Sequence, residues 1–226
     1  MSPIQFETLR AMVHVWTDSA TSEAAMRSWA CRQEPGPDTA LGEPGPSSLE
    51  VQRSERSQLW FAPPARWRFE SRAEGSEIPF IQIVNGSKWW LYNPIGRDSV
   101  VKAGEDSPSN RFVSEYPPFA AMWDLDLLDE SLVRVGLAEE TYVGRHCLRE
   151  RATPRVDLAD DEYGGIWPGA TEHELLIDAE HQVVIRWIAW YQSRFYGGVE
   201  LEAVAFNDVF DPSLFDAPAE ERLRIR

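Results

Sequence analysis

Residues 80–94 read Phe-Ile-Gln-Ile-Val-Asn-Gly-Ser-Lys-Trp-Trp-Leu-Tyr-Asn-Pro, and this stretch decides how the rest of the chain is interpreted. Asn85-Gly86 is a strong signal for a tight β-hairpin turn, because both residue types adopt positive φ angles readily. The runs on either side are apolar at successive positions, so both faces of the hairpin need cover. A hairpin of this kind belongs in a curved sheet that wraps around other parts of the protein or around a ligand.

The composition is that of a folded, acidic protein. Of its 226 residues, 43% are hydrophobic, which is enough for a substantial core. The chain contains 10 Trp, 10 Phe and 6 Tyr, residue types that favour sheets and also line apolar cavities. The formal net charge of −15 repels phosphate backbones and anionic lipid surfaces, so we expect no nucleic-acid partner.

The N-terminal residues Met-Ser-Pro-Ile-Gln-Phe-Glu lack the basic and apolar regions of an export signal. No run of about 18 apolar residues predicts a transmembrane segment. The sequence as written therefore predicts a cytoplasmic protein, or a periplasmic or extracytoplasmic one if the translation start is mis-assigned. Cys31 and Cys147 form no C-x-x-C pair, and we interpret both as core thiols.

The spacing of apolar residues predicts antiparallel strands interrupted by two helices. One helix is expected from Asp18 or Ser19 to about Arg32, and the other from Phe119 to Val135 with Gly136 as its C-cap. We expect one domain over residues 1–226, with a mobile Pro/Gly loop at 33–48 and a C-terminal tail at 217–226. The expected strands cover residues 7–16, 49–61, 66–70, both arms of the 80–94 hairpin, 99–102, 137–143, 146–154, 172–178, 182–192 and 199–206.

Residues 59–70, Leu-Trp-Phe-Ala-Pro-Pro-Ala-Arg-Trp-Arg-Phe-Glu, resemble the strand, proline turn and strand of outer-membrane lipoprotein carriers of the LolA/LolB family. Residues 84–94 are similar to the next hairpin of that family, where a turn glycine precedes an aromatic strand ending in Tyr-x-Pro. Residues 143–148 and 175–180 are similar to further strands of the superfamily, which includes RseB/MucB-like regulators of envelope-stress sigma factors. The resemblance covers roughly residues 8–215.

The resemblance implies an α+β fold in which a large curved antiparallel sheet forms an unclosed β half-barrel. Two helices would cover its concave face. It also implies that the concave face binds acyl chains or lipoproteins without chemistry. Carriers of this family are exported, which the sequence as written does not predict for this chain. The property of the family that we most expect this chain to share is therefore an apolar concave surface.

Aromatic side chains of the expected strands are the candidate lining of that surface. Alternation places neighbours such as Trp89 and Trp90 on opposite faces, and the sequence leaves open which face is concave. The alternative is that most of these rings pack beneath the helices. Arg66 and Arg68 are candidates for a rim that meets an anionic head group, or else they pair with nearby carboxylates. The candidate lining residues are Trp60, Trp67, Phe69, Phe80, Trp89, Trp90, Tyr92, Trp187 and Trp190.

No signature of catalysis or cofactor binding is present. The sequence lacks a nucleophile elbow, a P-loop and a dinucleotide fingerprint, and its four histidines lack metal-site spacing. We therefore predict a non-enzymatic protein without metal or cofactor. It would hold an apolar or acyl ligand, lipid- or lipoprotein-like, with residues 104–118 or 119–135 as a lid. The alternatives are a cytoplasmic protein-interaction or regulatory module with a filled concavity, and an enzyme with a site built from loops.

Overall fold

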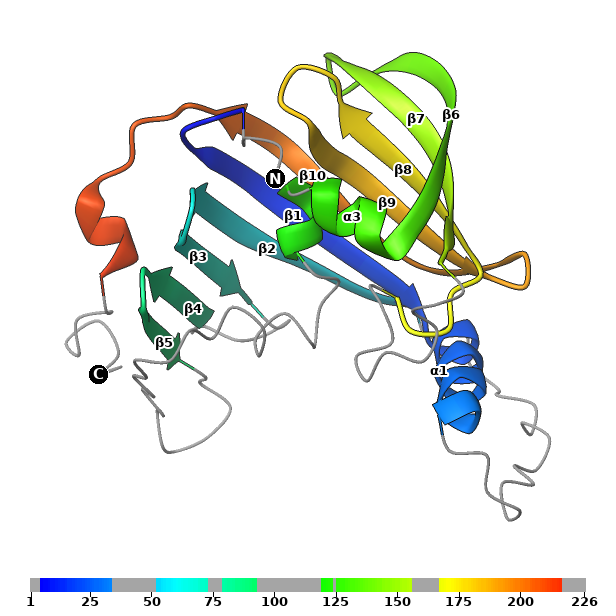
Figure 1. Cartoon of the computed structure of the whole chain (residues 1–226). Coiled ribbons are helices and arrows are strands. Elements are labelled where there is room, and N and C mark those ends of the chain that lie inside the picture. Colours follow the sequence, from blue (N-terminus) through cyan, green and yellow to red (C-terminus); the bar gives the residue numbers. More distant parts are fainter. Residues whose placement is uncertain are drawn as a thin grey trace. The chain divides into compact units, whose positions relative to one another are not determined.

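The computed structural model describes residues 5–33, 52–72, 79–92, 119–123, 125–155 and 167–216 of the chain (Figure 1). The expected strand at 99–102, the proposed lid loop at 104–118, the tail at 217–226 and nearly all of the 33–48 loop lie outside these residues. The described elements are β1 (Leu9–Asp18), α1 (Ser19–Gln33), β2 (Gln52–Ala62), β3 (Arg66–Ser71), β4 (Phe80–Asn85), β5 (Lys88–Tyr92), α2 (Phe119–Trp123), α3 (Leu125–Ser131), β6 (Leu132–Tyr142), β7 (Arg145–Pro154), β8 (Glu172–Asp178), β9 (Val183–Tyr191), β10 (Arg194–Phe206) and the 3-10 helix η3 (Pro212–Phe215).

The described strands form one antiparallel sheet of ten strands, in the order β5-β4-β3-β2-β1-β10-β9-β8-β7-β6. The order does not close on itself, because β5 and β6 each have one strand neighbour. The predicted fold class, α+β with a large unclosed antiparallel sheet, is confirmed (Figure 1). The described helices number three rather than the two expected.

The hairpin expected at residues 80–94 is present as β4 and β5. Asn85 pairs with Lys88, so the two turn residues are Gly86 and Ser87, one position later than expected. Gly86 takes the positive φ of +63° that the turn requires. In β4, the four residues from Ile81 to Val84 are all buried, which confirms that both faces of this strand are covered. The turn expected at Pro63-Pro64 joins β2 to β3.

The second predicted helix is wrong beyond Ser131. Residues 119–131 are helical, as α2 and α3, but β6 begins at Leu132 and pairs with β7. Leu132 and Val135 fit the helical stripe, whereas Val133 and Val135 fit the alternation of a strand, and pairing with β7 decides between the two. Gly136 is not a C-cap, because it lies at a β-bulge where the register shifts between Gly136 and Ala138.

The first predicted helix is present, and its start follows from local chemistry. Asp18 caps α1, since its Oδ1 accepts the Thr21 backbone N–H at 2.7 Å. The helix then packs closely on the chain before β8. A Cβ at Gly169 would lie 2.3 Å from the Ala25 carbonyl oxygen, and Gly169 has a φ of +83°. Only glycine fits this contact.

The chain divides into two compact units. Unit 1 comprises residues 1–5, 14–54 and 113–201, and unit 2 comprises residues 6–13, 55–112 and 202–226. Strands β1 and β10 contribute residues to both units. The core of unit 1 centres on β8 and β9, where Leu175, Ile185 and Trp187 are fully buried. The core of unit 2 includes Leu59, Phe69 and Phe215.

None of the described helices is both long enough and apolar enough to cross a membrane.

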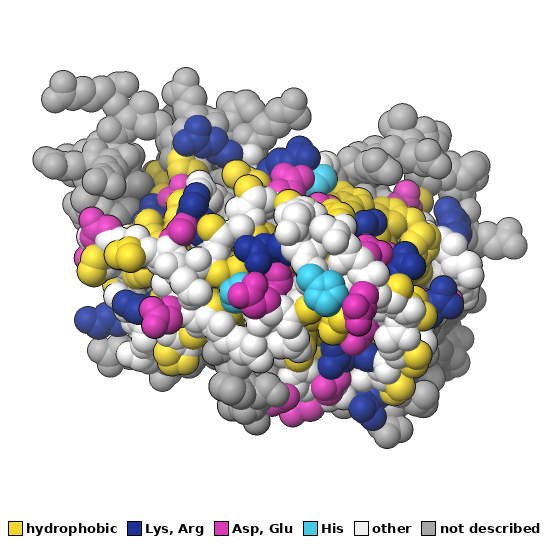
Figure 2. All heavy atoms as spheres, turned by 90° about the horizontal axis from the view of Figure 1, so that it is seen from above, with side chains coloured by type: hydrophobic (Ala, Val, Ile, Leu, Met, Phe, Trp, Pro, Cys, Tyr) yellow, Lys and Arg dark blue, Asp and Glu magenta, His cyan; other side chains and the backbone are white. Residues whose placement is uncertain are grey.

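Charged side chains of the described residues are largely mixed in sign. Arg10 pairs with Asp208 at 2.8 Å, and Arg56 pairs with Glu202 at 3.1 Å. Figure 2 shows acidic and basic side chains lying beside one another on the face in view, with no large area of one sign among the described residues. Exposed pairs of this kind contribute little to stability.

The contact between α1 and Gly169 can be tested by adding a methyl group. Gly169→Ala is expected to lower the free energy of unfolding by about 3 kcal/mol, because a clash with α1 adds to the strain of positive φ. Gly144→Ala is the matched control: Gly144 also has positive φ, +75°, but no described atom lies within 4 Å of its Cβ position. The control should lose only about 1 kcal/mol. Urea denaturation measures both, and equal losses would contradict the close packing of α1.

Candidate functional site

In unit 2, the strand register divides the predicted aromatic residues between the two faces of the sheet. Directly paired residues of antiparallel strands share a face. Trp60 pairs with Arg68, Arg68 with Ile83, and Ile83 with Trp90, so Trp60 and Trp90 lie on one face. The same face carries Arg66 and Tyr92. The opposite face carries Trp67, Phe69, Phe80 and Trp89.

The face with Trp60, Trp90 and Tyr92 is covered by the protein itself. A cluster of buried Ala62, Ile81, Ile83, Tyr92 and Phe215 is packed against Trp60, Trp90, Phe210 and Leu214. Residues 210–215, here called the C-terminal segment, include η3, whose N-cap Asp211 accepts the Ser213 backbone N–H at 2.9 Å. These three candidate lining residues therefore belong to a hydrophobic core in this structure.

Both candidate rim arginines contact the C-terminal segment. Arg68 donates to Glu70 at 2.6 Å and to the Leu214 carbonyl oxygen at 3.0 Å, and only 15% of its side chain is exposed. The Arg66 guanidinium lies 5.6 Å from the centre of the Phe215 ring. These contacts indicate that both arginines hold the C-terminal segment in place. For Arg68, the ion pair with Glu70 corresponds to the alternative in which it pairs with a nearby carboxylate.

The other side of the unit 2 sheet is also apolar. Leu59, Phe61 and Phe69 are buried there, whereas Trp67, Phe80 and Trp89 are partly exposed. The Phe6 ring extends the aromatic cluster, with its centre 6.0 Å from that of Phe61 and 5.4 Å from that of Phe206. We call this surface the aromatic face, made of Leu59, Phe61, Trp67, Phe69, Phe80, Val84 and Trp89.

In unit 1, the two candidate tryptophans lie on opposite faces of β9. Trp190 pairs with Phe195, and their ring centres are 6.0 Å apart. Trp187 shares the other face with Leu175 and is fully buried. Its indole N–H donates to Nδ1 of His173 at 3.1 Å. The sequence analysis proposed both rings as candidate lining residues, but a ligand on one face of β9 can contact only one of them.

His173 is a buried residue that the sequence analysis did not place in the site. Its side chain is 2% exposed, and burial lowers its pKa to about 3. The ring is therefore neutral near pH 7. An indole N–H can only donate, so Nδ1 of His173 must be the acceptor, and the ring proton lies on Nε2. The sequence signal was present: His173 and Leu175 lie on one face of β8, and they alternate with Glu172 and Glu174 on the other face.

His173 belongs to a row of small residues across the sheet of unit 1. It pairs with Ala152 of β7 and Ala189 of β9, and Ala189 pairs with Gly197 of β10. A Cβ at Gly197 would lie 2.8 Å from the Trp167 ring, so this ring covers the end of the row. The indole nitrogens of Trp167 and of Trp29 on α1 are buried and find no hydrogen-bond partner among the described residues.

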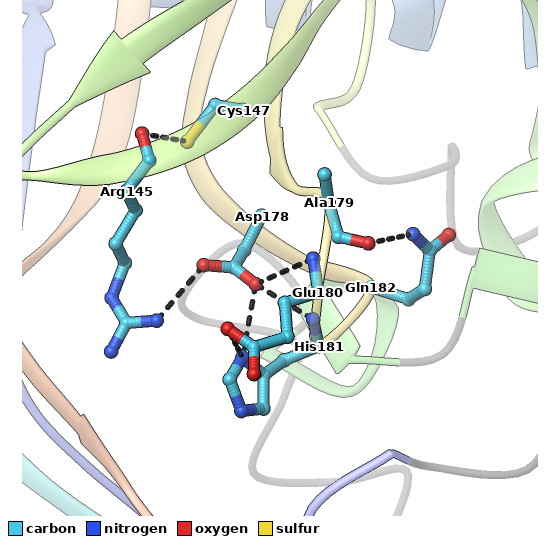
Figure 3. A network of polar contacts seen from close by, with 7 residues as sticks. All are labelled: Arg145, Cys147, Asp178, Ala179, Glu180, His181 and Gln182. Carbon is cyan, nitrogen blue, oxygen red and sulfur yellow. Dashed lines mark hydrogen bonds and ion pairs between the residues drawn. The ribbon is translucent and has the colours of Figure 1, made fainter.

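A polar network of unit 1 stabilises the turn between β8 and β9 (Figure 3). Asp178 accepts from Arg145 at 3.0 Å and from the backbone and ring nitrogens of His181 at 2.7 Å and 3.0 Å. Burial works to raise the pKa of Asp178, but these hydrogen bonds outweigh it and hold the pKa below its ordinary value. The neighbouring Cys147 is buried, and burial raises the pKa of its thiol. The arrangement therefore stabilises a turn and keeps Cys147 protonated.

No three metal-ligating side chains come together in the part of the chain that the structure describes.

No family model matches the chain, and no curated protein sequence matches it. Solved structures do resemble it. MucB superposes with a TM-score of 0.53 at 9% identity, over 96% of this chain and 59% of MucB. An uncharacterized conserved protein from Thermus thermophilus gives 0.49 at 9% identity, over 93% of this chain and 85% of that protein. A LolA superfamily protein from Nitrosomonas europaea gives 0.36 at 10% identity, over 93% and 92%.

The open sheet thus has a MucB-like fold, as the resemblance of residues 59–94 led us to expect. At 9% identity the likeness to MucB concerns the fold alone, and this chain spans 59% of the length of MucB.

The neutral state of buried His173 predicts a pH dependence of stability. Unfolded His173 takes up a proton near its ordinary pKa of 6.5, whereas the folded protein does so only near about 3. Between these values the unfolded state binds the additional proton, so stability is lost as the pH falls, at up to about 1.4 kcal/mol per pH unit. Urea denaturation between pH 6 and pH 4 measures this slope.

The control is His173→Gln, whose side-chain oxygen can still accept from Trp187. Other titrating groups are unchanged in this variant, so its slope should be shallower than that of the natural protein by the contribution of His173. Identical slopes would show that His173 is not held neutral by burial.

Proposed function

We propose that this protein is a non-enzymatic binding protein that holds an apolar or acyl ligand, lipid- or lipoprotein-like, on the aromatic face of unit 2. The observation that carries the proposal is the concentration of aromatic side chains on the aromatic face. Trp67, Phe80 and Trp89 are partly exposed there, and Leu59, Phe61 and Phe69 on the same face are buried. Partly exposed rings around a buried aromatic floor are the usual lining of an apolar ligand site.

The chemistry of the described residues supports binding rather than catalysis. The buried Cys147 thiol is kept protonated, and Asp178 and His181 are committed to the turn that they stabilise. Apolar burial alone supplies a driving force of about 25 cal/mol for each Å² removed from water, and it needs no charged partner. The fold shared with MucB supports the architecture of an open sheet and does not identify a ligand.

A charge placed on the aromatic face should abolish this binding. Trp89→Glu is expected to weaken the affinity for methyl dodecanoate at least tenfold, because a carboxylate would have to be desolvated beneath the acyl chain. Competition against an environment-sensitive apolar dye measures the affinity. Native mass spectrometry of the purified protein tests independently whether it carries an acyl adduct.

Val209→Glu is the matched control, because Val209 also belongs to unit 2 and is 99% exposed. It adds the same charge away from the aromatic face and should leave the affinity unchanged. If the natural protein neither carries an adduct nor binds methyl dodecanoate, the proposed function is wrong. If both variants bind as the natural protein does, the aromatic face is not the site.

The edge strand β6 supports the second candidate function, a protein-interaction or regulatory module. Val133, Val135 and Leu137 are 47%, 60% and 49% exposed, an unusual row of apolar residues on a strand with one neighbour. Ser131 accepts the Arg155 backbone N–H at 3.0 Å, so by alternation Arg134 and Gly136 direct their backbone groups away from β7. The exposed Glu139 and the net charge of −15 favour a basic, extended segment of another protein over a second copy.

A synthetic peptide of alternating Val and Lys residues is a probe for this edge. Hydrogen exchange should show protection of the Arg134 and Gly136 amides when the peptide is present, because these groups would enter a new ladder of hydrogen bonds. Val135→Lys should remove the protection, whereas Val209→Lys should not. Protection that persists in Val135→Lys, or that is absent from the natural protein, would contradict pairing at β6.

A further inference from the structure

Gln82 is a polar residue in the middle of the aromatic face of unit 2. It pairs with Phe69 of β3 and with Leu91 of β5, and directly paired residues share a face. Its neighbours on that face along β4 are Phe80 and Val84. Gln82 is only 9% exposed, and burying an amide is unfavourable unless it is hydrogen-bonded. Because β4 lies between β3 and β5, the backbone groups beside Gln82 are used in the ladders on both sides.

The polarity of the aromatic face changes along its strands. Three rows of directly paired residues cross β3 and β4 on this face, and successive rows are about 7 Å apart. The row that ends at Trp89 contains only aromatic and aliphatic residues. Gln82 is the polar residue of the middle row, and the third row joins Ser57 and Ser71 to Phe80. A ligand with one polar end and one apolar end matches this order.

The charges near this face favour a neutral polar group on the ligand. None of the described residues in the three rows is charged. At the polar end, the Ser71 hydroxyl donates to Glu55, and the net charge of −15 adds to this negative potential. An ionised carboxylate or phosphate would therefore lose its hydration without gaining a cation. A carboxamide offers N–H donors and a carbonyl acceptor, so it hydrogen-bonds to a neutral ester or amide without that penalty.

We propose that the Gln82 carboxamide donates a hydrogen bond to the carbonyl oxygen of a neutral acyl ester or amide bound on the aromatic face. The inference rests on the proposed function, which places an acyl ligand on this face, and it adds the group that is recognised and the residue that recognises it. With the carbonyl at Gln82, the acyl chain extends over the row that ends at Trp89. The rest of the head group lies towards Ser57 and Ser71. The protein thereby selects neutral acyl compounds over ionised fatty acids.

Gln82→Met tests this hydrogen bond, because methionine keeps an unbranched side chain of the same length and has no amide. The affinities of the natural protein and the variant for methyl dodecanoate and for tetradecane, each supplied from cyclodextrin, are measured by displacement of an apolar dye. The ester offers a carbonyl and the alkane offers none. The ratio of the ester affinity to the alkane affinity should fall about three- to tenfold in Gln82→Met, the range typical of one hydrogen bond.

Gln58→Met is the matched control, because Gln58 pairs with Glu70 on the opposite face of the same strands. It should leave the ratio unchanged. Without ligand, the unfolding midpoint of Gln82→Met should equal or exceed that of the natural protein, because an apolar side chain replaces a buried amide. The infrared band of methyl dodecanoate labelled with ¹³C at its carbonyl should lie at lower wavenumber on the natural protein than on Gln82→Met. Dodecanoate, an ionised probe, should bind the natural protein more weakly than the ester.

The outcomes separate this inference from the function on which it rests. If the natural protein binds neither the ester nor the alkane, both are wrong. If it binds both probes and the ratio is unchanged in Gln82→Met, or if dodecanoate binds more tightly than the ester, the inference is wrong and the proposed function stands. A lower unfolding midpoint in Gln82→Met together with an unchanged carbonyl band would assign Gln82 to the packing of the protein itself, and this result would also overturn the inference.

Discussion

A strand that is apolar at successive positions must be covered on both faces, and this constraint governs the structure. Residues Ile81–Val84 of β4 and Val183–Ile185 of β9 are buried without interruption, so neither of these strands faces water on one side. The sheet is open, and β5 and β6 remain as edges. Cover therefore comes from outside the sheet. Helices serve this purpose in unit 1, and the C-terminal segment does so for one face of unit 2.

The elements that could be predicted are those whose signals are local. The 80–94 hairpin, the turn at Pro63-Pro64 and the strand at 172–178 each combine apolar periodicity with turn residues inside a short window. The end of the second helix could not be predicted in this way, because Val135 fits both the helical spacing from Leu132 and the strand alternation from Val133. Residues 132–142 form a strand because they pair with β7. The energy of this pairing depends on the neighbouring strand and not on the sequence of residues 132–142 alone.

The candidate site was predictable in its residue types and only partly in its geometry. Alternation correctly separates Trp89 from Trp90, but the packing of Trp90 depends on a cluster that includes Phe215, far away in sequence. Burial of His173 beside Trp187 depends on the register of β8 against β9, which shifts at a bulge between Leu176 and Ile177. A one-residue shift changes which side chains share a face, so this meeting could not be derived from spacing. The architecture could be expected from the resemblance to lipoprotein carriers. The residues of the site follow only from contacts between strands that are distant in sequence.

The dependence of β4 and β5 on Phe215 has a consequence for biosynthesis. A ribosome releases the hairpin at residues 80–92 long before it reaches residues 210–215, because synthesis runs from the N-terminus. Until then Ile81, Ile83 and Trp90 lack their contact with Phe215. Strand β1 likewise lacks its neighbour β10, which is synthesised later. The nascent chain therefore carries an exposed, aggregation-prone apolar surface during most of its translation. Premature termination just before the C-terminal segment would leave this apolar surface exposed. Chaperones and proteases would then bind the product, and we expect no partly functional protein to accumulate.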